Sequence, residues 1–131
     1  MNDIQAVFDR QGAMRHLGIT IDRVAAGEVD LVCPFRDEVG QHHGYFHGGV
    51  VAVMLDVACG MAALTLMPDG QGVVSAEFKL NFLIPARGPL LRAEGRVVRA
   101  GRLLTVCTAY ALVDGRQVAL MQATMASVSQ P

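Results

Sequence analysis

The sequence predicts an α+β fold class in which an antiparallel sheet of about six strands wraps around one long central helix. Three observations lead to this prediction. Residues 50–67 form an 18-residue, mainly apolar run with a single charge, as expected for a helix buried on all sides. Segments on either side of this run alternate apolar and polar residues with the period of two that strands show. Asp114-Gly115 is a strong hairpin signal, which makes neighbouring strands antiparallel.

The size and composition of the chain predict a single domain, residues 1–131, with a large subunit interface. A chain of 131 residues can bury a core without disulfides or a structural metal. Hydrophobic residues make up 52% of the chain and charged residues 18%, which leaves more apolar surface than a small monomer easily hides. The net charge of −1 gives no general attraction to nucleic acid, which is therefore not expected as a partner.

The cysteines and the N-terminus predict a cytoplasmic protein. Cys33, Cys59 and Cys107 are odd in number and lack C-x-x-C spacing, and no basic, apolar leader begins the chain. The run over residues 50–67 approaches the length of a membrane span. However, Asp56 lies well inside it, and Lys and Arg are missing from both flanks. A buried core helix is favoured, and no membrane association is expected.

The first half of the chain is expected to contain a short helix, two strands and a loop before the long helix. The helix is expected over residues 3–14 and the strands over residues 16–25 and 28–35. Residues 37–46 contain glycines and adjacent histidines without a period, which is typical of a loop. Residues 68–70, Pro-Asp-Gly, are expected to end the long helix.

The second half is expected to form about four strands in a meander. The first of these strands begins at Val73 and ends at Pro85. Its buried face is expected to comprise Ala76, Phe78, Leu80, Phe82 and Ile84. Polar residues occupy the opposite face. Further strands are expected over residues 90–99, 103–113 and 116–126.

Two glycines, Gly48 and Gly49, stand where the loop enters the long helix. Free amide N–H groups at a helix N-terminus attract negative charge, and the missing side chains let a substrate come close. Such an N–H group would stabilise a carbonyl oxygen that becomes an oxyanion under attack. The alternative is that His47 and the two glycines only form a flexible entry to the helix.

Asp56 is a lone carboxylate in an otherwise apolar helix. Removing it from water costs several kcal/mol unless it finds a partner or is kept for function. Burial tends to raise the pKa of a carboxyl group, which helps a general base, whereas a nucleophile must be ionised at pH 7. Both catalytic roles stay open, as does that of a structural aspartate bonded to a neighbouring strand.

A set of motifs spread over residues 39–126 resembles a known family. The matching residues are Gln41, His47-Gly48-Gly49, Asp56, Val74-Ser75-Ala76-Glu77 and Phe82-Leu83-Ile84-Pro85. They resemble hotdog-fold acyl-CoA thioesterases of the PaaI-like, phenylacetate-degradation branch of the 4-hydroxybenzoyl-CoA thioesterase superfamily. The resemblance implies the hotdog fold and hydrolysis of an acyl-CoA to a free acid and CoA. Coenzyme A is then part of the substrate, and no separate cofactor is expected.

The resemblance also implies catalytic roles for four residues. Asp56 would be the general base or nucleophile, and the N–H of Gly48 would stabilise the oxyanion. Gln41 would orient substrate or water, although many members of this branch carry asparagine at its position. Ser75 would help to hold the attacking water.

Residues 87–102 hold five of the eleven Lys and Arg residues, all of them arginine. Arginine makes forked contacts with phosphate groups. The resemblance implies that the segment after Pro85 and the next hairpin turn bind coenzyme A. The candidates for substrate and CoA binding are His47, Gly49, Phe82, Pro85, Arg87, Arg99, Gly101 and Arg102. Solvated arginines on alternating strand positions are the alternative, and Arg92 and Arg96 are weaker candidates.

The spacing of Gly48 and Asp56 predicts a site shared between two subunits. These residues are eight positions apart, which corresponds to roughly 12 Å along a helix. Both cannot act on one carbonyl, because reacting atoms must lie about 3 Å apart. Two antiparallel helices across a two-fold axis would bring Gly48 of one subunit to Asp56 of the other. We therefore expect a homodimer, assembled further as a dimer of dimers.

Other catalytic centres are less well supported by the sequence. His42, His43 and His47 have no carboxylate or cysteine at ligand spacing, so no metal site is expected. Cys59 has no local histidine and is better explained as core packing. None of the three serines lies in a G-x-S-x-G motif.

Two other functions use the same fold. A hydratase or dehydratase would need a histidine about five residues after the aspartate, where Met61 stands. A non-enzymatic acyl-CoA sensor would lack the carboxylate and usually carries a DNA-binding domain, for which too few residues precede His16. For the thioesterase, the resemblance implies a phenylacetyl or hydroxyphenylacetyl group, and a medium-chain fatty acyl group stays open. Gly60 either leaves room for that group or lets the helix pack on the sheet.

Overall fold

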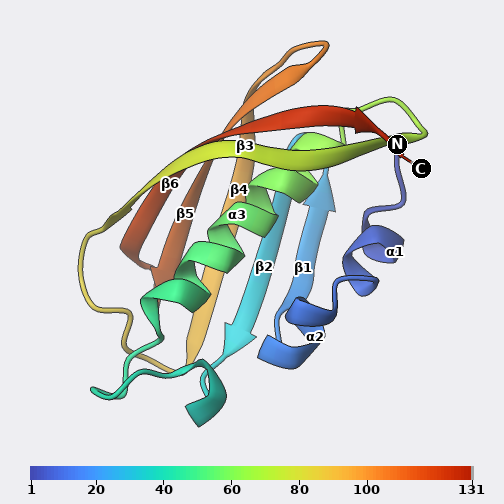
Figure 1. Ribbon diagram of the computed structural model, residues 1–131. Helices are drawn as coiled ribbons and strands as arrows, with labels where there is room; N and C mark the ends of the chain where they lie inside the picture. The colour runs from blue at the N-terminus through green and yellow to red at the C-terminus, as the bar shows by residue number, and fades with distance from the viewer. Residues whose placement is uncertain (131) are drawn as a thin grey trace.

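A six-stranded antiparallel sheet curves around the helix α3 in the computed structural model, which describes residues 1–130 (Figure 1). The order of strands across the sheet is β1-β2-β4-β5-β6-β3. The elements are α1 (Ile4–Asp9), α2 (Gly12–Leu17), β1 (Thr20–Ala25), β2 (Glu28–Pro34), a 3-10 turn η1 (Asp37–Val39), α3 (Gly48–Leu64), β3 (Gln71–Phe82), β4 (Leu90–Ala100), β5 (Leu104–Val113) and β6 (Arg116–Ser129). The predicted α+β hotdog arrangement is confirmed.

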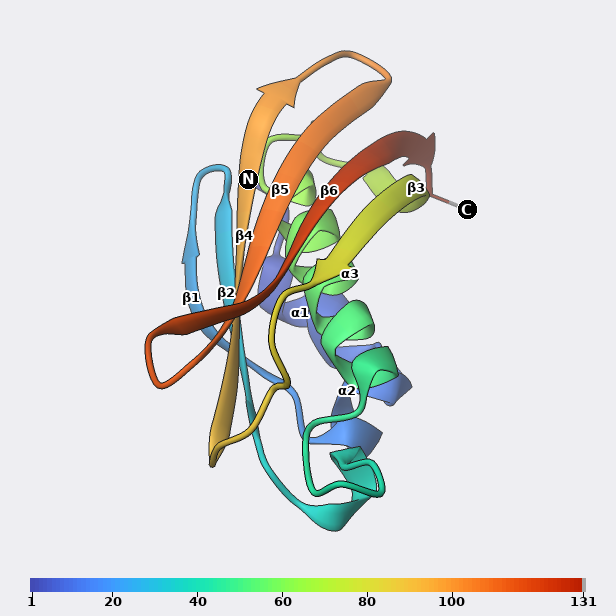
Figure 2. The same cartoon turned by 90° about the vertical axis from the view of Figure 1, so that its left-hand side faces the viewer.

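Helix α3 is apolar apart from Asp56, and the sheet and α1 cover most of it, whereas Ala52, Val53, Asp56 and Val57 are half-buried. Figure 2 shows α1, α2 and α3 on the same side of the sheet. The end of α3 is fixed by Thr65, whose hydroxyl donates to the carbonyl of Ala62 at 2.7 Å and accepts from the N–H of Gly27 at 2.8 Å. The side-chain amide of Asn2 donates to the carbonyls of Leu64 and Met67. The last turn of α3 is thus bonded to both the sheet and the N-terminus.

Small residues on the concave face of the sheet let α3 approach closely. Gly95 of β4 lies directly under the helix, and a Cβ atom built there would come within 2.4 Å of the carbonyl oxygen of Ala58. No side chain fits at that distance without moving the helix. Ala93, Ala109 and Cys107 are also fully buried on this face. The depth of α3 against the sheet therefore depends on the absence of a side chain at Gly95.

The N-terminal prediction was wrong in two details. Residues 3–14 form parts of two short helices, because α1 ends at Asp9 and α2 begins at Gly12. His16 belongs to α2 and not to the first strand, which begins at Thr20. Gly18 ends α2 with a φ of 73°, a left-handed conformation in which glycine is favoured. None of the helices formed by residues 1–130 is long and apolar enough to cross a membrane.

The predicted four-strand meander holds for β4, β5 and β6, which pair in order, but was wrong for β3, which does not pair with β4. Strand β4 lies between β2 and β5, and β3 pairs with β6 at the far edge of the sheet. The expected buried face of β3 was wrong for four of its five residues, because Ala76, Phe78, Phe82 and Ile84 are exposed where the edge strand extends past the flank of the helix. Phe78 is 45% exposed and Phe82 is 58% exposed, whereas Leu80 is half-buried. The hairpin at Asp114-Gly115 is confirmed, with φ angles of 50° and 76°.

We expect Gly95→Ala to destabilise the fold by about 2 kcal/mol, since the added methyl group forces α3 away from β4. Urea unfolding followed by circular dichroism measures this loss. Gly12→Ala is the matched control, because a Cβ there meets only a side-chain nitrogen of Arg15 at 3.5 Å. If the Gly95 variant is as stable as the control, the close approach of α3 and β4 is wrong.

Candidate active site

Asp56 and Ser75 are brought together by an irregularity in β3. Asp56 lies in the middle of α3 and is half-buried, and the hydroxyl of Ser75 donates to its Oδ1 atom at 2.5 Å. A β-bulge between Ser75 and Glu77 inserts one extra residue into the strand. Strict alternation would place Ser75 on the opposite face from Phe78. The bulge instead leaves both on the side of the sheet that faces α3.

The carboxylate of Asp56 opens into a cavity of about 590 Å³, called the Asp56 cavity here. It lies between α1, the C-terminal half of α3, the start of β3 and the end of β6. Its lining is Val7, Arg10, Gln11, Asp56, Val57, Gly60, Met61, Leu64, Gly72, Val73, Ser75, Met125, Val128, Ser129 and Gln130. A carboxylate in this setting reaches a mainly apolar space large enough for a small organic group.

A second cavity, of about 430 Å³, lies at the N-terminus of α3 and is called the Gly48 cavity here. Its lining is Gln41, Tyr45, Phe46, Gly48, Val51, Phe82, Leu83, Ile84, Pro85, Ala86 and Val118. It therefore contains four residues that the sequence assigned to catalysis or substrate binding.

Gly48 carries the free N–H group of the first turn of α3. His47 caps the helix, and its Nδ1 atom accepts from the N–H of Gly49 at 2.9 Å. The N–H groups of Val50 and Val51 both bond to the carbonyl of His47. Within residues 1–130, no acceptor lies within hydrogen-bond distance of the N–H of Gly48. That N–H group remains available for a bound oxygen atom, and the helix dipole favours negative charge there.

Gln41 holds its own loop with the oxygen of its side-chain amide. That oxygen accepts from the N–H of His43 at 2.5 Å and from the N–H of Tyr45 at 3.2 Å. The amide nitrogen has no acceptor among the described residues and stays free to donate. Any role in orienting substrate or water is therefore that of a hydrogen-bond donor.

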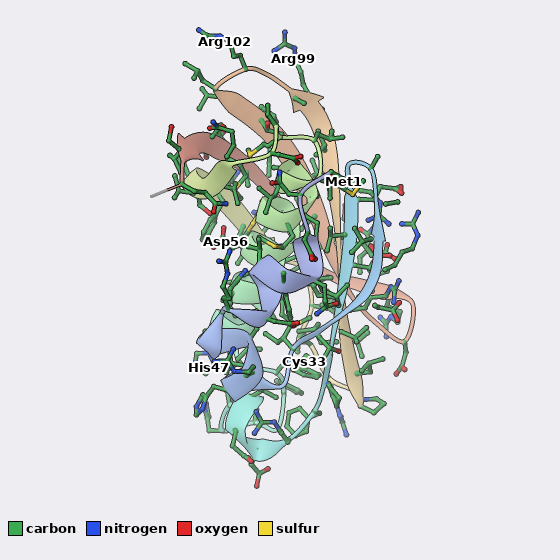
Figure 3. The ribbon with its side chains drawn as sticks, turned by 90° about the vertical axis from the view of Figure 1, so that its right-hand side faces the viewer. Met1, Cys33, His47, Asp56, Arg99 and Arg102 are labelled. Carbon is green, nitrogen blue, oxygen red and sulfur yellow. The ribbon has the colours of Figure 1, made fainter. Side chains whose placement is uncertain are left out.

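The two halves of the predicted catalytic set lie in different cavities of one chain. Asp56 and Ser75 line the Asp56 cavity, Gln41 and Gly48 line the Gly48 cavity, and the two linings have no residue in common. Figure 3 shows Asp56 well separated from His47 along α3. The structure thus agrees with the helix spacing, which allows no complete site within one chain.

The arginine candidates lie at opposite ends of the sheet. Arg87 precedes β4, near the Gly48 cavity, whereas Arg99 and Arg102 project from the β4–β5 hairpin at the other end (Figure 3). Strand β4 has 11 residues, which spans roughly 35 Å. One phosphate group cannot touch both places in a single chain.

Arg92 and Arg96 are bound to carboxylates on the outer face of the sheet. Asp30 is 2% exposed, and its oxygens accept from Arg92 at 2.9 Å and from Arg96 at 2.6 Å. A further hydrogen bond from Arg92 to Asp22 raises the pKa of this guanidinium. The sequence already ranked these two arginines as weaker CoA candidates, and their ion pairs give them a structural role.

The sequence pattern did not predict that α1 and the following turn form one wall of the Asp56 cavity. Val7, Arg10 and Gln11 line the Asp56 cavity, although they are more than 40 positions away from Asp56. The weak helical pattern of residues 3–14 gave no signal that this segment would pack near the carboxylate.

The cysteines and histidines supply no second catalytic centre in the part of the chain that the structure describes. Cys59 and Cys107 are fully buried, and contact with Cys107 together with burial raises the pKa of the Cys59 thiol. The rings of His42 and His43 are tilted against each other, with centroids 4.1 Å apart. No group of three His, Cys, Asp or Glu side chains within residues 1–130 is placed to hold a metal ion.

Comparison with known proteins identifies the family. A family model described as the thioesterase superfamily matches residues 43–119, which include Gly48, Asp56 and Ser75. The chain belongs to this superfamily. Membership confirms the predicted class of enzyme, a thioester hydrolase.

Three proteins illustrate how similar the chain is to known proteins. A thioesterase family protein from Silicibacter pomeroyi has 41% identical residues and a TM-score of 0.93, with 97% of this chain and 96% of that chain covered. A Ralstonia eutropha structure described as a phenylacetic acid degradation-related thioesterase has 27% identity and a TM-score of 0.84 over 95% and 99% of the two chains. An esterase of Halobacterium salinarum is 32% identical over 79% of this chain and 71% of its own length.

We expect thiol alkylation to leave thioesterase activity unchanged. The three cysteines are free and buried, and burial also raises the pKa of Cys33. A hydrogen bond with Cys59 lowers the pKa of Cys107, but this thiol is fully buried, so little thiolate is accessible. Treatment of the native protein with iodoacetamide, followed by mass spectrometry and a thioester hydrolysis assay, tests this. The protein denatured in urea should take up three labels. Labelling of the native protein at Cys59 with loss of activity would contradict the assignment.

Proposed function

We propose that this thioesterase hydrolyses an acyl-CoA to a free acid and CoA, at a site completed by two subunits. The observation that carries the proposal is the hydrogen bond from Ser75 to Asp56 at the mouth of a mainly apolar cavity. It holds one carboxylate oxygen and leaves Oδ2 free to act on water or on the thioester carbon. The acyl chain of an acyl-CoA is apolar and suits the remaining walls.

The chemical steps follow from these groups. The N–H of Gly48 polarises the thioester carbonyl and stabilises the oxyanion. As a general base, Asp56 takes a proton from water, and the resulting hydroxide attacks the carbonyl carbon. The tetrahedral intermediate then collapses, and the C–S bond breaks with the electron pair on sulfur, which receives the proton that Asp56 took from water and leaves as CoA. As a nucleophile, Asp56 would instead form an anhydride that water opens; both routes use the same residues.

The exposed edge of the sheet supports the proposed dimer. Strand β3 has 12 residues and leaves one side without a partner strand within residues 1–130. Large apolar side chains are exposed along it and just beyond its end, namely Val74, Phe78, Phe82, Leu83 and Ile84. A long apolar edge strand invites pairing with a second chain. A two-fold axis beside this edge lets the two α3 helices lie antiparallel, and assembly of two such dimers is the further expectation.

The proposed dimer would also bring together arginines that lie far apart in one chain. The β4–β5 hairpin lies beyond the C-terminal end of α3 (Figure 1). An antiparallel partner brings the Arg99 and Arg102 of that partner toward the end of the molecule that carries Gly48 and Arg87. Forked contacts from both subunits then suit the several phosphate groups of one coenzyme A.

The PaaI-like branch is the proposed place of the chain within the superfamily. The motif residues Gln41, Gly48, Asp56 and Ser75 support it, as does the likeness to the Ralstonia protein described as phenylacetic acid degradation-related. An arylacetyl group is therefore the first candidate acyl group, followed by a medium-chain fatty acyl group. Three free thiols support a reducing, cytoplasmic location.

Asp56→Asn is expected to lower kcat for acyl-CoA hydrolysis by about 10³-fold, because the amide neither accepts a proton nor attacks carbon. Release of free thiol from a panel of acyl-CoAs measures this. Ser75→Ala should show a smaller loss, since the carboxylate remains. Unfolding curves that match the wild type exclude a folding defect. An Asn variant with full activity, or a wild type that hydrolyses no acyl-CoA, would overturn the proposal.

Mixing two inactive variants tests whether the site is shared. Gly48→Pro removes the free N–H at a position where helices accept proline, and Asp56→Ala removes the carboxylate. After random exchange, half of the dimers are heterodimers, and each has one intact site out of two. We expect recovery of about a quarter of wild-type activity. Exchange verified by mass spectrometry without any recovery would show that both residues act within one chain.

A further inference from the structure

His47 holds its imidazole ring against the first turn of α3. The Nδ1 atom accepts from the N–H of Gly49 at 2.9 Å. The backbone N–H of His47 donates to the carbonyl of Val39 at 2.9 Å, which fixes the residue to the entry loop. A Cβ atom built on Gly49 would come within 3.2 Å of Nδ1 and 3.5 Å of Cε1 of this ring. The ring therefore lies on Gly49, and glycine at that position leaves the space that the ring occupies.

This hydrogen bond exists in only one protonation state of the ring. A ring nitrogen accepts a hydrogen bond only when it carries no proton, so the proton of the neutral imidazole is on Nε2. Uptake of a second proton places an N–H group at Nδ1, facing the N–H of Gly49. The charge that comes with it stands at the positive end of the dipole of α3. Protonation of His47 therefore breaks the bond and drives the ring away from Gly49.

The ring of His47 is exposed to solvent, and its bond to Gly49 is the one side-chain hydrogen bond that it makes within residues 1–130. No ion pair in this part of the chain includes a histidine. Proton uptake by the ring therefore follows the pH of the solvent. The neighbouring elements carry titratable or charged groups that are not bonded to the ring, namely Asp37 and Glu38 of η1, His42, His43 and Tyr45 of the entry loop, Asp56 of α3, Glu77 and Lys79 of β3, and Arg87 after β3.

We propose that His47 is a positioning residue whose neutral ring keeps the N–H of Gly49 occupied, so that Gly48 presents the one free N–H group of the first turn. This inference rests on the proposed function, because it requires the N–H of Gly48 to bind the thioester oxygen. Protonation of His47 frees the N–H of Gly49 and loosens the first turn of α3, and the oxygen is then no longer held at one place. In the proposed dimer, the imidazolium also forms an ion pair with the partner's Asp56 and takes that carboxylate away from water. Activity is lost as the ring takes up a proton.

The dependence of kcat on pH tests this role, with phenylacetyl-CoA as the substrate. The wild type should lose about tenfold in kcat between pH 7.5 and pH 5.5, the range in which imidazole takes up a proton. His47→Asn keeps a side-chain acceptor for the helix N–H groups but does not titrate. It should keep a kcat within about threefold of the wild type at pH 7.5 and should not decline at pH 5.5.

Two further variants complete the test. His47→Ala has no acceptor, and we expect its kcat at pH 7.5 to be about tenfold lower with little change in KM, because the N–H of Gly49 is free at every pH. His43→Asn is the matched control, since His43 is an exposed histidine of the same loop that lines neither cavity. It should keep the pH profile of the wild type.

The outcomes separate the two proposals. A wild-type kcat that does not fall down to pH 5.5, or a fall that His47→Asn retains, overturns the role of His47 and leaves the proposed function intact. An Asn variant as slow as the Ala variant at pH 7.5 also overturns it, because the ring would then act through a contact that asparagine does not make. Failure of the wild type to hydrolyse any acyl-CoA at pH 7.5 overturns the proposed function and this inference with it. An acid decline that is lost in His47→Asn and kept in His43→Asn supports both.

Discussion

The burial of most of α3 against the curved sheet is the constraint on which the rest of the structure depends. A 17-residue helix without an amphipathic stripe needs cover on every face. The curved sheet supplies most of it because Gly95 lets the backbone of α3 come close, and it leaves the side with Ala52, Val53 and Asp56 half-buried. A carboxylate is tolerated on such a helix only where neighbouring strands and helices no longer bury it completely. Asp56 meets that condition, since it lies beside the edge strand β3, where Ser75 offers a hydrogen bond and the cavity admits solvent. The position of the proposed catalytic carboxylate therefore follows from how the sheet covers the helix.

Strand β3 serves both the site and the proposed assembly because it lies at the edge of the sheet. Its bulge turns Ser75 toward α3, and the strand beyond it carries Phe78 and Phe82 past the flank of the helix. A central strand would have buried these rings and left no edge for a partner. The exposed aromatic residues and the half-buried carboxylate therefore have the same origin in the topology.

Sequence reasoning found the features that depend on local pattern. The apolar run gave α3, the Asp-Gly pair gave the β5–β6 hairpin, and the motif residues fell on one helix, its entry loop and β3. Sequence reasoning failed where pairing between strands that are distant in the sequence determines the structure. Alternation alone could not show that β3 pairs with β6 or that a bulge at Ser75 changes its face, since both depend on hydrogen bonds with distant residues. The cavity wall at Arg10 and Gln11 was missed for the same reason, as short helices take their position from tertiary contacts.

The order of charges along α3 favours the antiparallel arrangement of the proposed dimer. His47 occupies the N–H of Gly49, so the partial positive charge of the helix N-terminus is presented at Gly48, and the negative charge of Asp56 lies about 12 Å further on. In an antiparallel pair each helix N-terminus lies near the partner's carboxylate, which gives two favourable contacts. In a parallel pair the two N-termini lie side by side, as do the two carboxylates, so like charges meet. Such dipole effects contribute only about 0.3–1 kcal/mol each, too little to hold two chains. The apolar edge of β3 must supply most of the affinity, and the charges on α3 then decide which of the possible orientations gives two working sites.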